Sequence, residues 1–267
     1  MSKNEMAEDE FARDTLERYS ASPASKFQSN LLLTDSPRYV RCFAEKYGVA
    51  VYEGTLFNVA HHPTEELSIL DFKTGLPAAA LAVDLCSFLD VKAALFLGMC
   101  GGLRKRYKIG EYLVPVASIR ADRTSDGYFP SEVPALSNFL MQKAVTDVLE
   151  KKHVDYHIGM TYTTSRRFWE HHEEFIAHLK TTRAQAIELE CATLFTGSYK
   201  RRLTLGALLL ISDLPLDRDR VRTKESSEKI FRNFMVDHLD KGIEAVKRGR
   251  KMQSRKMKGA YHRNIGM

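Results

Sequence analysis

Short runs of apolar residues, rich in branched side chains, recur along this chain and alternate with stretches in which apolar residues return every three or four positions. Strands buried on both faces have the first pattern, and helices that pack on a sheet have the second. The strand-like runs lie at residues 30–33, 67–72, 93–97, 112–119 and 204–211. The helix-like stretches lie at residues 10–19, 39–47, 78–89, 136–152, 190–200 and 226–248. This alternation predicts an α/β fold whose helices cover both faces of a largely parallel sheet.

The length of the chain limits it to one large core. Its 267 residues are 44% hydrophobic, which is enough for a single substantial domain and leaves little for a second. We therefore predict one globular domain over residues 1–250 and a basic tail over residues 251–267. No apolar run approaches the roughly 18 to 20 residues that span a bilayer, and residues 1–14 lack the apolar segment of a signal peptide. We expect a soluble, cytoplasmic protein without membrane contacts.

The scattered cysteines and the absence of common nucleotide-binding and metal-binding motifs exclude several kinds of site. The four cysteines are scattered, without a Cys-x-x-Cys pair or a neighbouring histidine cluster: Cys42, Cys86, Cys100 and Cys191. This pattern predicts reduced thiols and neither a zinc site nor a disulfide framework. The chain also lacks a P-loop, a Gly-x-Gly-x-x-Gly run and a His-Glu-x-x-His motif. We expect no metal and no cofactor.

The net charge of +6 belongs to one end of the chain. Residues 247–263 contain eight lysines and arginines and no acidic residue, so removing their charge leaves −2 for the rest. The eight are Lys247, Arg248, Arg250, Lys251, Arg255, Lys256, Lys258 and Arg263. Such a segment can attract RNA or another anionic surface without sequence preference, but a solvated, frayed terminus explains it more simply. Nucleic acid is therefore not the expected partner.

Two irregular segments after predicted strands could reach a ligand. Ligands in open α/β sheets bind at the carboxyl ends of strands, and the strand expected at residues 93–97 runs into glycines. Glycine there lets the backbone approach a ligand closely or makes a sharp turn, and the sequence leaves both open. Residues 120–134 form a second irregular segment in position to contact substrate. The residues of the glycine-rich run considered for binding are Gly98, Met99, Cys100 and Gly101.

Two glutamates flank one apolar residue where a strand leads into the helix expected at residues 190–200. Glu188 and Glu190, on either side of Leu189, would point to the same side of an extended backbone and could face one pocket. Paired acids can hold the vicinal hydroxyls of a ribose. The alternative is that one glutamate lies in the first helical turn, where the macrodipole favours it, and the other is solvated.

The strand expected at residues 204–211 ends in Ser212 and Asp213. An aspartate at such an end is poised for partial burial, which raises the pKa of a carboxyl group toward the range where it can donate a proton. Ser-Asp before Pro215 is also ordinary turn or capping chemistry. Taken alone, this motif leaves both interpretations open.

The three motifs, in this order on successive strand ends, resemble those of the nucleoside phosphorylase and nucleosidase superfamily. The resemblance implies a three-layer α/β/α sandwich with a twisted central mixed sheet. It implies that Glu190 holds the ribose hydroxyls and that Leu189 contacts the sugar face. It also implies that Asp213, oriented by Ser212, meets purine N7. Because members form dimers, trimers or hexamers, we expect a homo-oligomer.

Further segments are similar to the short form of the AMP nucleosidases and extend the match over about residues 15–245. They include residues 97–103, 119–125, 130–136 and 162–171. Two departures matter. The short nucleosidases carry a basic residue where this chain has Met99, and Arg38 instead resembles the phosphate-binding arginine of the phosphorylases. Phosphorylases also carry an arginine and a hydroxyl residue where this chain has Phe96 and Met99, and an apolar pair would hold orthophosphate poorly.

A substrate with a 5′-phosphate needs a bidentate cationic partner, for which arginine is better suited than lysine. Arg166 and Arg167 are the first candidates and Arg38 is the second, with exposure to solvent as the alternative. Phe168 and Trp169 could stack on an adenine ring. Trp169, the single tryptophan, could equally belong to the core.

The resemblance implies hydrolysis of the N-glycosidic bond of AMP to adenine and ribose 5-phosphate, with Asp213 as general acid. Two alternatives remain within enzymes: a purine nucleoside phosphorylase, and a nucleosidase acting on an unphosphorylated adenosine derivative. A non-catalytic nucleotide- or RNA-binding protein is less well supported, because a binder does not need both Glu190 and Asp213. The sequence does not identify the residue that activates water.

Overall fold

Ten strands form one mixed sheet in the computed structural model of the chain, which describes the backbone of residues 3–264 and the side chains of residues 7–217 and 219–255. The strands are β1 (Asn30–Thr34), β2 (Val51–Glu53), β3 (Asn58–His62), β4 (Leu67–Asp71), β5 (Ala93–Gly102), β6 (Tyr112–Ala121), β7 (Ala135–Leu136), β8 (Tyr156–Thr164), β9 (Ala186–Glu188) and β10 (Leu205–Asp213). Their order is β10-β6-β8-β9-β5-β1-β4-β3-β2, with β7 paired to β6.

One half of the sheet closes on itself, because β10 pairs with β5 as well as with β6. Strands β6, β8, β9 and β5 complete the ring. The pairs β1–β4, β1–β5, β5–β10, β6–β8 and β8–β9 are parallel, whereas β6–β10, β5–β9 and the β2–β3–β4 edge are antiparallel. The sheet is therefore mixed, as the family resemblance implied, rather than largely parallel.

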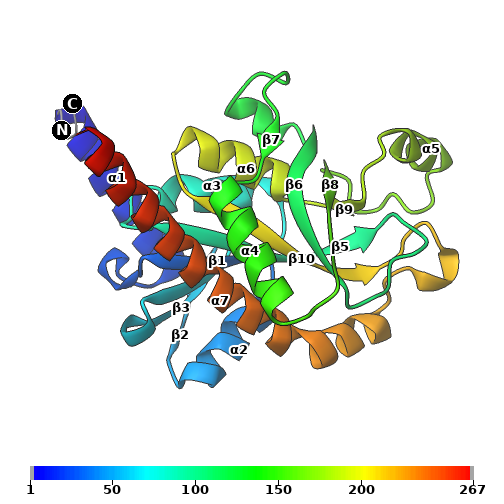
Figure 1. Ribbon diagram of the computed structural model, residues 1–267, viewed down its shortest axis with the longest axis horizontal. Coiled ribbons are helices and arrows are strands. Elements are labelled where there is room, and N and C mark those ends of the chain that lie inside the picture. Colours follow the sequence, from blue (N-terminus) through cyan, green and yellow to red (C-terminus); the bar gives the residue numbers. More distant parts are fainter. Residues whose placement is uncertain (1–2, 265–267) are drawn as a thin grey trace.

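Helices cover both faces of this sheet (Figure 1). On one face lie α1 (Lys3–Ser20), α3 (Leu76–Cys86) and α6 (Cys191–Lys200). On the other lie α2 (Pro37–Tyr47), α4 (Phe139–Lys151) and α7 (Lys224–Asn264), and Figure 1 shows α4 and α7 crossing this face. Helix α5 (Glu173–Thr181) packs in a smaller cluster of its own. The predicted three-layer α/β/α sandwich is confirmed.

Successive residues of the central strands enter opposite cores. Leu31 and Leu33 of β1 pack toward α1, α3 and α6, while Leu32 between them packs toward α2, α4 and α7. All three leucines are fully buried. Because both faces of β1 are covered, its sequence is a continuous apolar run without polar alternation.

The apolar runs and periods of the sequence coincide with β1, β4, β5, β6 and β10 and with every helix except α5. They do not predict β2, β3, β8 or α5, in which polar residues interrupt the apolar pattern, or β7, which has only two residues. Strand β8, for example, carries His157, Thr161 and Thr163 among its apolar residues. Helix α7 also continues to Asn264, beyond the end expected at residue 248.

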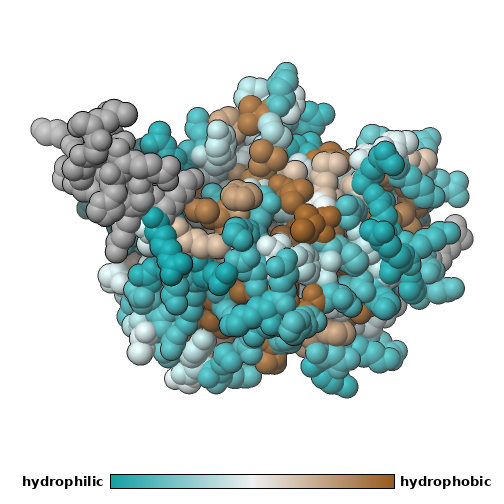
Figure 2. Space-filling view, viewed as in Figure 1, coloured by the Kyte–Doolittle hydropathy of each residue, from teal (hydrophilic) through white to brown (hydrophobic). Residues whose placement is uncertain are grey.

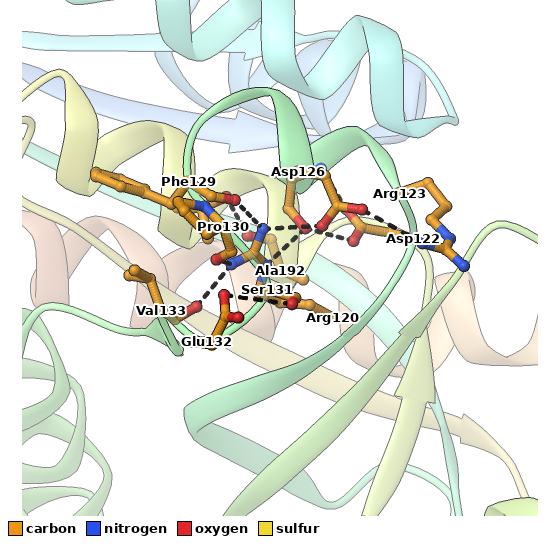
Figure 3. Close-up of polar contacts among 12 residues, drawn as sticks. Arg120, Asp122, Arg123, Asp126, Phe129, Pro130, Ser131, Glu132, Val133 and Ala192 are labelled. Carbon is orange, nitrogen blue, oxygen red and sulfur yellow. Dashed lines mark hydrogen bonds and ion pairs between the residues drawn. The ribbon is translucent and has the colours of Figure 1, made fainter.

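The irregular segment at residues 120–134 is organised around one buried arginine (Figure 3). The Arg120 side chain is 5% exposed, and its guanidinium donates to the carbonyl oxygens of Phe129 at 2.6 Å and Val133 at 2.7 Å. Further bonds to Ser125 Oγ, Asp126 and the Pro130 carbonyl use its other donors. This segment supplies none of the described residues that line the candidate site below, so within one chain the substrate contact expected of it is not present.

The basic segment begins within α7, and part of its charge is neutralised on the surface. Three ion pairs join Lys247 to Glu65, Arg248 to Asp147 and Arg250 to Glu66. Residues 251–264 of the predicted tail continue α7, while residues 265–267 lie outside the described chain. The side chains of Lys256, Lys258 and Arg263 also lie outside the described residues.

The surface in Figure 2 is mostly polar, with apolar side chains gathered near the centre of the view. Large apolar side chains that are exposed in the described part of the chain include Leu136, Phe139, Ile158 and Tyr199. No described helix combines the length and the hydropathy that a bilayer span requires.

Candidate active site

A pocket of about 130 Å³ lies where the ends of β1, β5, β8, β9 and β10 meet. It is lined by Asp35, Thr74, Met99, Cys100, Gly101, Thr164, Arg167, Trp169, Glu170, Ile187, Glu188, Leu189, Glu190, Ser212, Asp213, Pro215 and Arg222. All three sequence motifs therefore contribute to one site. Four residues proposed from the sequence are not part of this lining: Gly98, Arg166, Phe168 and Arg38.

Asp213 enters the pocket at the end of β10, where a β-bulge shifts the pairing with β5. Such a bulge changes the direction of the side chains that follow it. The Ser212 hydroxyl donates to Asp213 Oδ1 at 2.6 Å and lies 3.2 Å from the Cys100 carbonyl oxygen. Burial raises the pKa of Asp213, and the bond from Ser212 and the charge of Arg222 oppose this rise in part. Burial therefore makes Asp213 easier to protonate than an exposed aspartate is.

Glu188 is held entirely by the protein. One carboxylate oxygen, Oε2, accepts the backbone N–H groups of Glu190 at 2.7 Å and Cys191 at 2.6 Å, which open helix α6. The other, Oε1, accepts the hydroxyls of Ser118 and Thr161 at 3.3 and 3.1 Å, and that of Thr163. Glu188 thus satisfies the amino end of a helix and ties it to β6 and β8.

Glu190 is the N-cap residue of α6, and its backbone is not extended (φ −136°, ψ −31°). Glu188 and Glu190 both line the pocket, as predicted, but they reach it from a strand end and a helix N-cap and not from one strand face. Glu190 is 2% exposed, and its Oε1 atom has no hydrogen-bond partner among the described residues. Burial, with the nearby carboxyl groups of Asp35 and Glu188, raises the pKa of Glu190 well above its ordinary value. An unpartnered buried oxygen in a pocket is a place for a ligand donor.

Asp35 adds a third carboxyl group, directly after strand β1. Its carboxyl is surrounded by protein although the residue keeps some exposure, and this burial raises its pKa to about 6, with smaller contributions from Asp71 and Glu188 and an opposing one from Arg222. In the sequence, its position just after a predicted strand marks it, and Thr34-Asp35 is one of the segments that resemble the AMP nucleosidases.

The glycine-rich run continues strand β5 and makes no turn. A Cβ on Gly101 would lie 2.8 Å from Pro215 Cγ, and a Cβ on Gly98 would clash with the Phe96 ring. The turn interpretation is therefore wrong: Gly98 makes room for a core side chain. Gly101 lets the segment after β10 lie against the strand beside the pocket.

Of the residues proposed to bind phosphate or adenine on the segment after β8, Arg167 and Trp169 line the pocket. Arg166 and Phe168 are exposed and lie outside its lining because their side chains face solvent. Trp169 is 4% exposed and packs in the cluster around α5, so it is at once a core residue and a wall of the pocket. Arg167 is 65% exposed and pairs with Glu170 at 3.1 Å.

Arg38 lies outside the pocket. Its two terminal nitrogens both bond the Glu228 carboxylate, with Nη1 to Oε2 at 2.8 Å, and its guanidinium lies 4.4 Å from the Phe231 ring centre. It borders a different surface hollow, between α2 and α7. Arg38 is therefore paired with protein groups and does not face the carboxyl groups of the pocket.

Arg222, between β10 and α7, lines the pocket in its place. Its Nε donates to Ser227 Oγ at 2.8 Å, and its Nη2 lies 3.3 Å from Met99 Sδ. The sequence gives no signal for this residue, because it is one of several arginines in a charged connecting segment.

The pocket can therefore supply a proton from Asp213, an acceptor for ligand hydroxyls from Glu190 and positive charge from Arg222. In the part of the chain that the structure describes, no group of three or more His, Cys, Asp or Glu side chains is arranged to hold a metal ion.

Comparisons with known proteins show the family and the fold of the chain. Residues 31–243 match the family model of the phosphorylase superfamily. A solved AMP nucleosidase from Bacteroides thetaiotaomicron is 36% identical, with a TM-score of 0.79 over 90% of this chain and 96% of that chain. The AMP nucleosidase of Escherichia coli K12 is 26% identical over 93% of this chain, which spans 61% of that relative's length. A solved uridine phosphorylase from Vibrio fischeri, 18% identical, shares the fold with a TM-score of 0.74 over 84% of this chain and 93% of its own.

Proposed function

The chain belongs to the phosphorylase superfamily and has a nucleoside phosphorylase-like fold, and we propose that it hydrolyses the N-glycosidic bond of AMP to adenine and ribose 5-phosphate. One observation carries the proposal: Asp213, whose pKa burial raises, shares a pocket with Glu190, whose Oε1 has no partner in the described chain. The similarity to AMP nucleosidases supports a purine nucleotide as substrate.

Cleavage of the bond requires that the departing adenine does not carry away a negative charge. Asp213 donates a proton to N7 of the purine, an effect typically worth about 10² to 10⁴ in rate. Ser212 serves both forms of this acid. Its hydroxyl donates to Asp213 Oδ1 when the aspartate is ionised, and the Cys100 carbonyl oxygen, 3.2 Å away, accepts that hydroxyl proton when Asp213 is protonated.

The ribose acquires positive charge as the bond breaks, and carboxylates stabilise it. Glu190 accepts a hydrogen bond from a ribose hydroxyl through its unpartnered oxygen. Leu189, which lines the pocket, contacts the sugar face. Glu188 does not bind substrate in this scheme, because its two oxygens are occupied by five protein donors. It positions Glu190 by fixing the start of α6.

We assign the activation of water to Asp35. The other carboxyl groups of the pocket have separate tasks: Asp213 is the acid, Glu190 holds the sugar, and Glu170 pairs with Arg167. The pKa of Asp35, raised by burial to about 6, suits a base that works near neutral pH. Water gives a proton to Asp35 and its hydroxyl to the anomeric carbon, while adenine leaves with the proton from Asp213.

The surroundings of the residues that stand where a phosphorylase would bind orthophosphate favour hydrolysis over phosphorolysis. Arg38, the residue that resembles the phosphorylase arginine, is neutralised by Glu228 outside the pocket. Phe96 is 1% exposed and packs beside Phe72 in the core, so it leaves no polar group in that place.

The test is adenine release from AMP in phosphate-free buffer, with adenosine and added orthophosphate as parallel reactions. Release from AMP without phosphate is expected. Release from adenosine alone, and only with orthophosphate, would contradict the proposal and identify a phosphorylase.

We also propose that subunits associate into a homo-oligomer, dimer-based or hexameric. The exposed apolar side chains Leu136, Phe139, Ile158 and Tyr199 support this, because such groups on one chain favour burial against another. Light scattering at the mass of a single 30.4 kDa chain would contradict it.

A further inference from the structure

We infer that Arg222 binds a phosphate group in this pocket. The inference deepens the proposed function: the phosphate is the 5′-phosphate of the nucleotide or, if the enzyme is a phosphorylase, free orthophosphate. Both have the same chemistry, and the experiment below distinguishes them.

The contacts of Arg222 fix its guanidinium and leave most of its donors open. A guanidinium has five N–H donors. Nε uses one on Ser227 Oγ at 2.8 Å, which fixes the plane of the group. Nη2 uses one on Met99 Sδ at 3.3 Å, and a thioether is a weak acceptor. The remaining donors have no acceptor in the described chain, so they can bind a ligand oxygen pair.

The charge of Arg222 is also uncompensated. No described carboxylate lies within ion-pair distance of it, whereas Arg38 pairs with Glu228 and Arg167 pairs with Glu170. A half-buried cation without a counter-ion is unfavourable unless a ligand supplies the negative charge. Its field reaches Asp35 and Asp213, since it opposes the rise in pKa of both. Arg222 is therefore close enough to Asp35 and Asp213 for its charge to act on both carboxyl groups.

A phosphate group fits this cation better than a neutral ligand does. The pocket already contains the carboxyl groups of Asp35, Glu190 and Asp213, and a dianion entering among them requires positive charge close by. Arginine meets phosphate oxygens through two parallel N–H bonds. Because Arg166 faces solvent outside the pocket and Arg167 pairs with Glu170, Arg222 is the arginine of the described pocket lining that has no carboxylate partner.

The experiment measures binding without turnover. Isothermal titration calorimetry with AMP, adenosine and inorganic phosphate is performed on Asp213→Asn protein, with and without Arg222→Gln. Lys224→Gln, an exposed residue two positions further on, is the matched control for loss of one charge. Loss of a charge-assisted contact should weaken affinity about tenfold or more.

Two results support the inference and identify the source of the phosphate. Weaker binding of AMP with unchanged binding of adenosine assigns Arg222 to the 5′-phosphate. Loss of orthophosphate binding with unchanged AMP binding assigns it to free orthophosphate. Equal affinities in the presence and absence of Arg222→Gln, or equal weakening of AMP and adenosine, would overturn the inference.

A rescue variant makes the test independent of simple damage to the fold. Because Met99 Sδ lies 3.3 Å from Arg222 Nη2, a lysine at position 99 places an ammonium group in the same space. Met99→Lys in the Arg222→Gln protein should recover at least part of the preference for AMP over adenosine. If Arg222→Gln loses its native circular dichroism spectrum, Arg222→Met replaces it as a second uncharged variant, and unchanged AMP and phosphate affinities with that variant contradict the inference.

Turnover of the wild-type protein separates this inference from the proposed function. Phosphate-selective binding that depends on Arg222, without adenine release from AMP, would retain the inference and refute the hydrolysis. Adenine release from AMP by the wild type, together with wild-type AMP affinity in the Arg222→Gln variant, would support the hydrolysis and refute the inference.

Discussion

Glu188 and Glu190 are two positions apart in the chain, and the structure predicts opposite outcomes for the same substitution at each. Glu188→Gln should destabilise the fold, while Glu190→Gln should leave the fold intact and remove activity. The difference follows from the number of protein donors that each carboxylate accepts.

The cost at Glu188 can be worked from its contacts. Its oxygens accept two backbone amides and three hydroxyls, and an amide side chain presents only one acceptor oxygen. If that oxygen still accepts the two backbone N–H groups at the start of α6, two charge-assisted hydrogen bonds become neutral ones. Each costs about 1 kcal/mol. Displaced hydroxyl bonds add about 1 kcal/mol. We expect a total of about 3 kcal/mol, or a fall in Tm of about 6 to 12 °C.

Glu190→Gln replaces a buried carboxyl group whose Oε1 has no partner in the described chain, so the Tm should stay equal or rise slightly. The value of kcat/KM should fall about 10- to 100-fold, because the carboxyl group that accepts a ribose hydroxyl is lost. Differential scanning fluorimetry and adenine release measure both effects, with the exposed Glu174→Gln as control. A Glu188→Gln protein with wild-type Tm, or a Glu190→Gln protein that unfolds early and retains kcat, would refute the assignment.

Three further predictions concern the acid, the base and the excluded arginine. Asp213→Asn should lower kcat about 10²- to 10⁴-fold without changing the Tm, and near wild-type turnover would remove Asp213 from the mechanism. The kcat/KM of the wild type should fall below pH about 6 as Asp35 takes up a proton, and Asp35→Asn should be inactive at every pH. Because the folded pKa of Asp35 lies above 3.8, the folded state binds more protons between pH 3.8 and about 6, and stability falls as pH rises through this window. Chemical denaturation at pH 7 should therefore show Asp35→Asn to be more stable by about 1 to 2 kcal/mol, after discounting for its partial exposure; a less stable variant contradicts this sign. Arg38→Gln should leave KM for AMP within about twofold, since Glu228 already occupies the guanidinium, and a tenfold rise would place Arg38 in the site.

The layered fold could be predicted from the sequence because its signals are local. A strand such as β1, buried on both faces, is apolar at every position whatever its neighbours are. Strand β8 could not be found in this way, because several of its polar residues bond to other elements: Thr161 and Thr163 contact Glu188, and His157 contacts Glu111. Their hydrogen bonds, and not apolarity, justify their place in the sheet.

The sequence by itself determined the alternation of strands and helices, the order of the three motifs on strand ends and the identity of Asp213 and Glu190 as candidates, because each depends on residues that are neighbours in the chain. Only the tertiary structure decided which glutamate and which arginine have atoms left to bind a substrate. Glu188 is engaged because Ser118, Thr161 and Thr163 arrive from β6 and β8. Arg38 is neutralised by Glu228, 190 positions away, whereas Arg222 meets only a serine hydroxyl and a thioether. Whether a charged group binds substrate or the protein depends on its partners in space, and those come from segments that are distant in the chain.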